Sequence, residues 1–247
     1  MFRRNIIIYT FFILLLYPSV AQTADWTILP SGLAYKQIEI VLNESVISLH
    51  ALKIDPSQYT IKPIFSETSA SVQKLALKTG SLAVINANFF DTKGRVLGLV
   101  RNDNKNINNI KKISWWSVFC HKNKQAKIVH TTQYNDTFCE QAVQAGPRLV
   151  VDGIMPKLKD ELSRKTVVGI DRQGFIIFVV SKQEIPIKLL AEIMTQSETN
   201  GGFDCPNAIN MDGGGSSQLY IQDAPVDYNL PSFVEVPVGL GVFLNEK

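Results

Sequence analysis

The stretch from Asn210 to Ser217, which reads N-M-D-G-G-G-S-S, carries one acid, three consecutive glycines and two hydroxyls between short apolar runs. A carboxylate at such a turn can serve as a nucleophile or as a base. Glycine permits positive φ and close approach of the backbone, and free amides in a concave turn bind anions such as phosphate. The pattern predicts a catalytic Asp212 beside an anion site.

The same residues also fit a tight hairpin turn, because D-G and G-G between apolar runs are strong turn signals. A hairpin needs one or two glycines, so the third glycine favours a functional loop. A dinucleotide fingerprint is a poor match, because the G-x-G-x-x-G spacing is absent and no helix is predicted after the loop.

Three other segments share the composition of this loop, with small residues, glycine and a polar side chain at a predicted strand end. They are Asn86–Asp91, Ala145–Leu149 and Arg164–Asp171. The first of them continues through Gly94 to Gly98. If these strand ends converge, they bring amides, a guanidinium, hydroxyls and a carboxylate into one pocket.

The segments Asn88–Phe90, Ala145–Arg148, Arg164–Gly169 and Asn210–Ser217 resemble, in this order, the motifs of the phosphodiester glycosidase family. The resemblance extends over roughly residues 83 to 242 and includes the terminal P-V-G-L-G segment. One departure is Ala87-Asn88, where family members commonly show a glycine pair.

The resemblance implies hydrolysis of a sugar 1-phosphodiester at the glycosidic carbon, which releases the sugar from its phosphate. The leaving phosphate is already a stable anion, so the main task is to stabilise an oxocarbenium-like centre beside it. Asp212 is predicted to face the anomeric carbon as nucleophile or as base for water. Asn88 is predicted to bind a sugar hydroxyl or to position the water, and Arg148 to grip two phosphate oxygens. The predicted substrate-binding residues are Gly213, Gly214, Gly215, Ser216, Ser217 and Thr166.

Several of these residues also have structural interpretations. Arg148 equally fits a pair with a structural carboxylate, and Asn88 fits a left-handed strand end. A second acid, if one is needed, is Asp91 or Asp171, although Asp171 also suits a type I turn. The alternatives for the whole protein are a non-catalytic binding module for phosphorylated glycans and a phosphoesterase that cuts P–O.

Short strands dominate the predicted elements, and their number against two or three helices predicts an α+β fold with a mixed, largely antiparallel sheet. One helix is predicted from Ser71 to Lys78, with Ser69 or Ser71 as its cap and Gly80 as its stop, and another from Ile187 to Gln196. The predicted strands are Tyr35–Leu42, Val46–Ile54, Tyr59–Phe65, Leu82–Ala87, Val96–Val100, Ile113–Cys120, Lys127–Thr132, Pro147–Val151, Thr166–Ile170, Phe175–Val180 and Val236–Leu244.

The amino terminus has the composition of a signal peptide, with Arg3 and Arg4 before the apolar run Ile6–Tyr17. Cleavage is predicted after Ala21, with Ala24 as the alternative, so that residues 25–247 form one exported domain, periplasmic or secreted. Loss of the two arginines lowers the formal charge from +3 to +1. This near-neutral charge argues against nucleic acid and acidic membrane surfaces as partners and leaves a sugar-phosphate or glycoconjugate substrate.

The three cysteines predict one disulfide in an oxidising compartment, between Cys120 and Cys139, which flank two strands and a loop. Cys205 is then free, as a small buried thiol or, alternatively, as a nucleophile paired with histidine.

No zinc spacing is present, and no metal or other cofactor is predicted to be required. Asp212, Asp91 and Asn88 are hard oxygen ligands that would suit calcium or magnesium, but no acid-rich loop of known spacing accompanies them. The oligomeric state cannot be inferred from the sequence.

Overall fold

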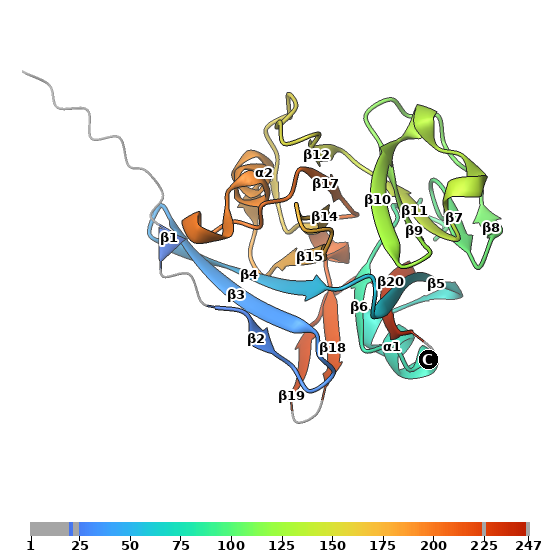
Figure 1. The fold of residues 1–247 in the computed structure, drawn as a ribbon, viewed down its shortest axis with the longest axis horizontal. Coiled ribbons are helices and arrows are strands. Elements are labelled where there is room, and N and C mark those ends of the chain that lie inside the picture. Colours follow the sequence, from blue (N-terminus) through green and yellow to red (C-terminus); the bar gives the residue numbers. More distant parts are fainter. Residues whose placement is uncertain (1–19, 22–24, 224–225, 246–247) are drawn as a thin grey trace, which may run out of the picture.

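The computed structural model describes residues 20–21, 25–223 and 226–245 of the chain (Figure 1). The predicted leader and the Ala24 cleavage site lie outside the described residues, apart from Val20 and Ala21. The described elements form four sheets and two α-helices, and every strand pair among them is antiparallel. The predicted α+β class is therefore confirmed.

The largest sheet has eight strands and contains the strands on either side of the predicted site. Its strand order is β1-β3-β4-β15-β14-β17-β12, with β2 paired to β3. The strands are β1 (Val20–Ala21), β2 (Thr27–Ile28), β3 (Ala34–Leu42), β4 (Ser45–Ile54), β12 (Arg148–Val150), β14 (Thr166–Ile170), β15 (Ile176–Ser181) and β17 (Asn207–Asn210).

Two five-stranded sheets make up most of the remaining structure, and a two-stranded ribbon completes it. The first has the order β19-β18-β6-β20-β5 and the second β10-β9-β11-β7-β8. The strands of the first are β5 (Tyr59–Ala70), β6 (Ala83–Asn86), β18 (Leu219–Asp223), β19 (Val226–Leu230) and β20 (Val236–Leu244). The others are β7 (Val100–Asn102), β8 (Lys105–Asn108), β9 (Ser117–Lys122), β10 (Gln125–His130) and β11 (Gln141–Ala145), with β13 (Leu162–Ser163) and β16 (Ile185–Pro186) in the ribbon.

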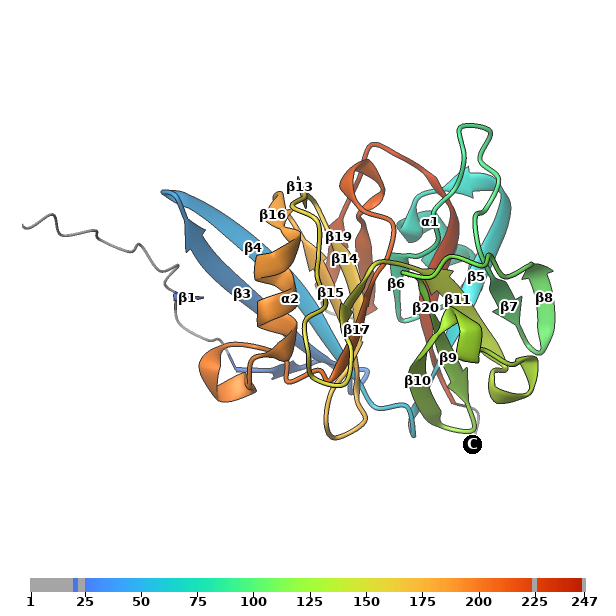
Figure 2. The same cartoon turned by 90° about the horizontal axis from the view of Figure 1, so that it is seen from above.

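The main core lies between the eight-stranded sheet and the sheet that contains β6. Phe178 and Ile209 from the first pack in one buried cluster with Ile85 and Leu240 from the second. Figure 2 shows the two groups of strands side by side, with β17 and β6 near their junction. Burial of these apolar side chains drives the two sheets together, so the strand ends at the junction hold fixed positions.

The two α-helices form where the sequence predicts them. Helix α1 (Val72–Thr79) begins after Ser71, whose hydroxyl accepts a hydrogen bond from the Lys74 amide, and ends at Gly80 with a φ of 68°. Helix α2 (Ile187–Thr195) buries an apolar face against the eight-stranded sheet (Figure 2). Four 3₁₀ turns complete the helical elements: η1 (Thr131–Gln133), η2 (Asp136–Phe138), η3 (Glu198–Asn200) and η4 (Gly214–Ser216).

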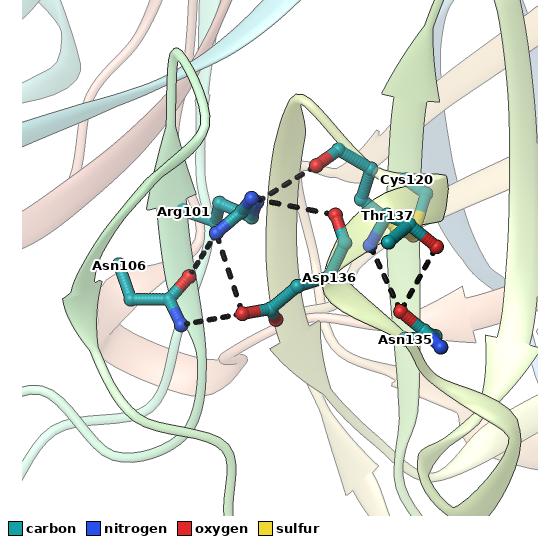
Figure 3. Close-up of polar contacts among 7 residues, drawn as sticks. Arg101, Asn106, Cys120, Asn135, Asp136 and Thr137 are labelled. Atoms are coloured by element: carbon teal, nitrogen blue, oxygen red, sulfur yellow. Dashed lines mark hydrogen bonds and ion pairs between the residues drawn. A yellow bond between two sulfur atoms is a disulfide. The ribbon is translucent and has the colours of Figure 1, made fainter.

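The predicted disulfide between Cys120 and Cys139 is present, with 5.1 Å between the Cα atoms, and it lies beside a buried arginine (Figure 3). Arg101 donates to the Cys139 carbonyl over 2.7 Å and to the Asn106 side chain over 2.7 Å, and it pairs with Asp136 at 3.6 Å. The disulfide and the arginine together fix the loop after β10 to the second sheet.

Cys205 is free and buried, and burial raises the pKa of its thiol well above the usual value. A thiol with a raised pKa is a poor nucleophile, which favours the buried-thiol interpretation of Cys205.

Some predicted strands differ from the observed ones. The expected strand Val96–Val100 is mostly loop, because strand β7 starts only at Val100. The expected strand Ile113–Cys120 begins at Ser117, so Trp115 and Trp116 lie in the preceding loop. Strand β11 was not predicted, since its sequence Q-A-V-Q-A lacks a strong apolar alternation.

Among the described residues, no helix has the length and apolar character needed to cross a membrane. The same part of the chain holds no group of three His, Cys, Asp or Glu side chains placed to share a metal ion.

Candidate active site

Asp212 lies where strands β17, β14 and β6 meet. The amide of Met211 donates to the Thr166 carbonyl over 2.8 Å, and the amide of Asp212 donates to the Ala87 carbonyl over 2.9 Å. These two bonds tie the residues after β17 to the start of β14 and to the end of β6. The backbone of Asp212 is therefore fixed by two different sheets.

Asn86, the last residue of β6, links the same three segments through its buried side chain. Its Nδ2 donates to the Asp212 carbonyl over 2.6 Å, while its Oδ1 accepts from the Thr166 hydroxyl at 2.7 Å and from the Gln218 amide at 3.0 Å. Two of these bonds go to residues on either side of the three glycines, Asp212 and Gln218, and the third goes to Thr166 at the start of β14. Asn86 thus determines where Asp212 sits, a role that sequence analysis missed.

A cleft of about 370 Å³ opens above Asp212. It brings together members of three of the four predicted segments and two residues, Glu161 and Ser163, from the three positions before the remaining segment, Arg164–Asp171. Its lining consists of Phe89, Trp115, Gly146, Pro147, Glu161, Ser163, Asn210, Asp212, Gly213 and Gly214. The predicted convergence of strand ends is therefore observed for three of the four segments, and Trp115, Glu161 and Ser163 complete the lining.

The Asp212 carboxyl is partly buried, and this burial raises its pKa above the usual value for aspartate. Hydrogen bonds from the Ser216 side chain and the Gly213 amide favour the charged form and offset part of the effect of burial. A carboxyl with a raised pKa in a cleft is typical of groups that exchange protons or attack carbon during catalysis.

The glycine loop differs from the predicted nest of free amides. The Gly214 amide donates to the Arg164 carbonyl at 2.8 Å, and the Ser216 amide donates to the Gly213 carbonyl at 3.1 Å. The prediction that these two amides face an anion is therefore wrong, because both already donate hydrogen bonds to backbone carbonyls. The Gly213 amide serves Asp212, which leaves the Gly215 amide with no partner among the described residues.

The three consecutive glycines have structural reasons. Gly214 has a φ of 59°, in the left-handed region that favours glycine. A Cβ on Gly213 would lie 2.9 Å from the Arg164 carbonyl oxygen, and one on Gly215 would lie 2.9 Å from the Val234 side chain. The third glycine, which had favoured a functional loop, is required by packing.

Asn88 and Thr166 lie behind the cleft surface rather than on it. The Nδ2 of Asn88 donates to the carbonyls of Leu99 and Gln144, both at 3.0 Å, and its Oδ1 is buried without a partner among the described residues. Thr166 is buried and donates to Asn86. Both residues position neighbouring backbone, and neither lines the cleft.

Arg148 and Ser217 also lie outside the cleft lining. Arg148 is partly buried at the start of β12 next to Pro147, and its guanidinium forms no hydrogen bond or ion pair with any residue in the described part of the chain. A structural carboxylate partner for Arg148 is therefore absent from that part. The Ser217 hydroxyl is buried and has no partner among the described residues.

The two acids considered as a second carboxylate hold turns elsewhere. Asp91 accepts from the Arg95 amide and pairs with the Arg95 guanidinium at 2.7 Å. Asp171 accepts from the Phe175 amide and pairs with Lys53 at 3.2 Å. Neither lines the Asp212 cleft, so the turn interpretation holds for both.

The cleft instead contains a second carboxylate at Glu161, which sequence analysis did not identify. Glu161 pairs with the ammonium of Lys165, a residue with no solvent-exposed surface, and this pairing lowers the pKa of the Glu161 carboxyl. The cleft therefore holds two acids whose environments shift their pKa values in opposite directions, raised for Asp212 and lowered for Glu161. When two carboxyls in one site have pKa values shifted in opposite directions, the one with the raised pKa commonly exchanges a proton and the other stays charged.

Comparisons with known proteins identify a family and several similar folds. The model of the phosphodiester glycosidase family matches residues 79–243. The fold is similar to the catalytic domain of zebrafish N-acetylglucosamine-1-phosphodiester alpha-N-acetylglucosaminidase, auto-inhibited by its pro-peptide. This match has a TM-score of 0.67 and 17% identity and covers 94% of this chain and 88% of that domain.

Two bacterial structures are also similar. A hypothetical protein from Synechocystis has a TM-score of 0.63 at 15% identity, with 93% of this chain and 64% of that one covered. A protein from Burkholderia pseudomallei whose name suggests export has a TM-score of 0.53 at 11% identity, with 84% and 74% covered. None of the curated proteins matches the sequence. Because the family model covers most of the chain, this protein belongs to the phosphodiester glycosidase family.

Proposed function

We propose that this protein hydrolyses the glycosidic bond of sugar 1-phosphodiesters and releases the sugar from its phosphate. The observation that carries the proposal is the Asp212 carboxyl, which two sheets hold in a cleft and whose pKa is raised by burial. Family membership supports the same reaction. The zebrafish protein is named for hydrolysis of an N-acetylglucosamine 1-phosphodiester, so N-acetylglucosamine is the first sugar to test.

The two carboxylates of the cleft have different roles in this proposal. Asp212 faces the anomeric carbon as nucleophile or as base for water, and its raised pKa matches a group that exchanges a proton. Glu161 stays ionised beside Lys165 and stabilises the positive charge that develops on the sugar ring. The leaving phosphate needs little protonation because it departs as a stable anion.

Arg148 is the proposed phosphate ligand outside the immediate cleft lining. Its guanidinium has no partner among the described residues, and a planar fork without a partner can bind two phosphate oxygens. Asn88 and Thr166 act in this proposal by holding the segments around the cleft, Asn88 through the carbonyls of Leu99 and Gln144 and Thr166 through the Asn86 side chain. The Gly215 amide is the substrate contact that this proposal keeps from the loop, because the amides of Gly213, Gly214 and Ser216 already have partners.

We also propose that the protein is exported. The Cys120–Cys139 disulfide requires an oxidising compartment. The amino-terminal sequence has the composition of a signal peptide that would direct export. The similar Burkholderia protein, whose name suggests export, points in the same direction.

The test is hydrolysis of UDP-N-acetylglucosamine and of methyl and phenyl N-acetylglucosamine 1-phosphodiesters by the parent and by Asp212→Asn. We expect free reducing sugar from the parent and at least a thousandfold less from the variant, in the range of removal of a catalytic carboxylate. Asp91→Asn, which changes a partly buried turn acid outside the cleft lining, is the matched control and should retain turnover.

Three outcomes separate the alternatives. Binding without turnover in the parent would favour a module that only holds phosphorylated glycans. Hydrolysis in oxygen-18 water distinguishes the bond that is cut, because C–O cleavage puts the label in the sugar and P–O cleavage puts it in the phosphate. Activity that is lost with a chelator and restored by calcium or magnesium would contradict the prediction that no metal is required.

A further inference from the structure

The Asp212 cleft continues into a second pocket of about 420 Å³. Trp115, Pro147 and Glu161 line both spaces, so the two are joined along one wall. The second pocket adds Lys157, Leu158, Lys159 and Ile187, and its volume is in the range of small-molecule sites. A molecule that occupies the Asp212 cleft can therefore extend past Trp115 without leaving the surface of the protein.

The inner part of this pocket is apolar, and its wall carries an indole. Leu158 and Ile187 are buried core residues, which gives the pocket a rigid floor. Trp115 is 54% exposed, and its ring meets the buried Trp116 edge to face at 5.7 Å. An indole that is held in place but left half open offers a flat surface on which a ring can stack.

The charge of the pocket rim is positive and uncompensated. Lys157 and Lys159 are exposed, and neither forms an ion pair or a hydrogen bond through its ammonium with any described residue. The acids nearby already have partners, since Glu161 pairs with Lys165 and Asp160 pairs with Lys188 at 2.6 Å. The two unmatched ammonium groups attract an anion to the side of the pocket away from Asp212.

We propose that this second pocket, which we call the Trp115 pocket, is the aglycone subsite and selects an aglycone with a flat ring and a second anionic group. The proposal rests on the proposed function, because that function places the sugar at Asp212 and the phosphodiester near Trp115. The ring of the aglycone then stacks on Trp115, and its anionic group reaches Lys157 and Lys159. The scissile bond and its atoms are unchanged, since the subsite only binds the part of the substrate that leaves with the phosphate.

The experiment measures kcat/KM for two N-acetylglucosamine 1-phosphodiesters, one with a phenyl and one with a 4-carboxyphenyl aglycone. The parent should prefer the carboxyphenyl substrate. In the double variant Lys157→Gln/Lys159→Gln this preference should fall by about fivefold to tenfold, the range of two exposed charge contacts. The electronic effect of the carboxylate on the leaving group is the same in both proteins, so it cancels in the comparison.

The control is Lys105→Gln/Lys124→Gln, which removes the same charge from exposed turns and edges away from the cleft. It should leave the preference at the parent value. Added salt should reduce the preference in the parent and in the control but not in Lys157→Gln/Lys159→Gln.

An equal preference in the parent and in Lys157→Gln/Lys159→Gln would overturn the proposed subsite while leaving the proposed function intact. An equal loss in both double variants would also overturn it, because the effect would then be one of overall charge. Absence of sugar release from both substrates would instead show that the proposed function fails.

Discussion

Substitution of Asn86 by alanine is the sharpest test of how the fold positions Asp212. The side chain is buried and makes three hydrogen bonds, one as donor to the Asp212 carbonyl and two as acceptor from Thr166 and Gln218. Alanine removes all three and leaves two donors and one carbonyl without partners. This one change therefore removes the side chain that connects Asp212, Thr166 at the start of β14 and Gln218.

The expected cost follows from the number of bonds. Each buried hydrogen bond contributes about 1 kcal/mol net, so the free energy of unfolding should fall by about 3 kcal/mol. The Asp212 carboxylate should also lose its position relative to the substrate. A displacement on the order of 1 Å at such a group costs about a hundredfold in rate, so kcat should fall more than the folded fraction alone explains.

The assays are urea unfolding with the disulfide intact and sugar release from the phenyl phosphodiester at a temperature where the variant is fully folded. Asn108→Ala is the matched control, because it removes an asparagine side chain that donates to two backbone carbonyls, of Val96 and Gly98, and is not bonded to Asp212. It should lower stability by about 2 kcal/mol and leave kcat unchanged.

Asn86→Asp adds a readout that does not depend on turnover. The carboxylate still accepts from Thr166 and Gln218 but places a negative charge against Asp212, which should raise the pKa of Asp212 further. NMR titration of the labelled aspartates measures this pKa directly. A loss of stability below 1 kcal/mol in Asn86→Ala, or an unchanged Asp212 pKa in Asn86→Asp, would refute the assignment of Asn86 as the positioning residue.

Three further predictions concern stability. Asp212→Asn should raise the free energy of unfolding at neutral pH by on the order of 1 kcal/mol. A carboxyl whose pKa is higher in the folded state than in the unfolded state destabilises the fold once the pH rises above the unfolded-state pKa. Thermal unfolding should show this gain at pH 7 and its loss below pH 4. Gly169→Ala should cost about 1–3 kcal/mol in denaturant unfolding, because its Cβ would lie 2.7 Å from the Cys205 sulfur, and Cys205→Ala should relieve part of the cost. Removal of the disulfide by Cys120→Ala/Cys139→Ala should cost about 3 kcal/mol, and an unchanged urea midpoint would contradict its structural role.

The parts of the fold that local chemistry determines were predictable from sequence. Ser71 and Gly80 determine the ends of α1, and Asn43-Glu44 with positive φ at both residues makes the turn between β3 and β4. Strand β11 was not predictable in this way, because its buried Gln144 is satisfied by the backbone of Leu99 and of Lys111 in separate loops. A buried polar side chain in a core strand can be predicted only when its hydrogen-bond partners, which are distant in sequence, are known.

The same division applies to the site. Asp212 could be proposed from sequence because the glycines that shape its turn are its neighbours in the chain. Asn86 was missed as a functional residue since its three partners lie 80 or more positions away along the chain. Glu161 was missed because the sequence K-L-K-D-E is typical of a solvated loop, and only the tertiary structure reveals that Lys165 is fully buried beside it.

The correction of the glycine loop changes where the substrate's charge must be held. With the amides of Gly214 and Ser216 occupied by backbone carbonyls, the loop cannot neutralise a phosphate by itself. The cleft lining contains two acids and no cation, so a phosphate placed deep beside Asp212 would meet repulsion. A sugar ring has no such penalty and suits that position, whereas the phosphodiester is better accommodated toward Arg148 and the Trp115 pocket, where the lysines lie. For the proposed function, this charge distribution favours a substrate bound with its sugar inward, which is the orientation that the proposed attack of Asp212 or its water on the anomeric carbon requires.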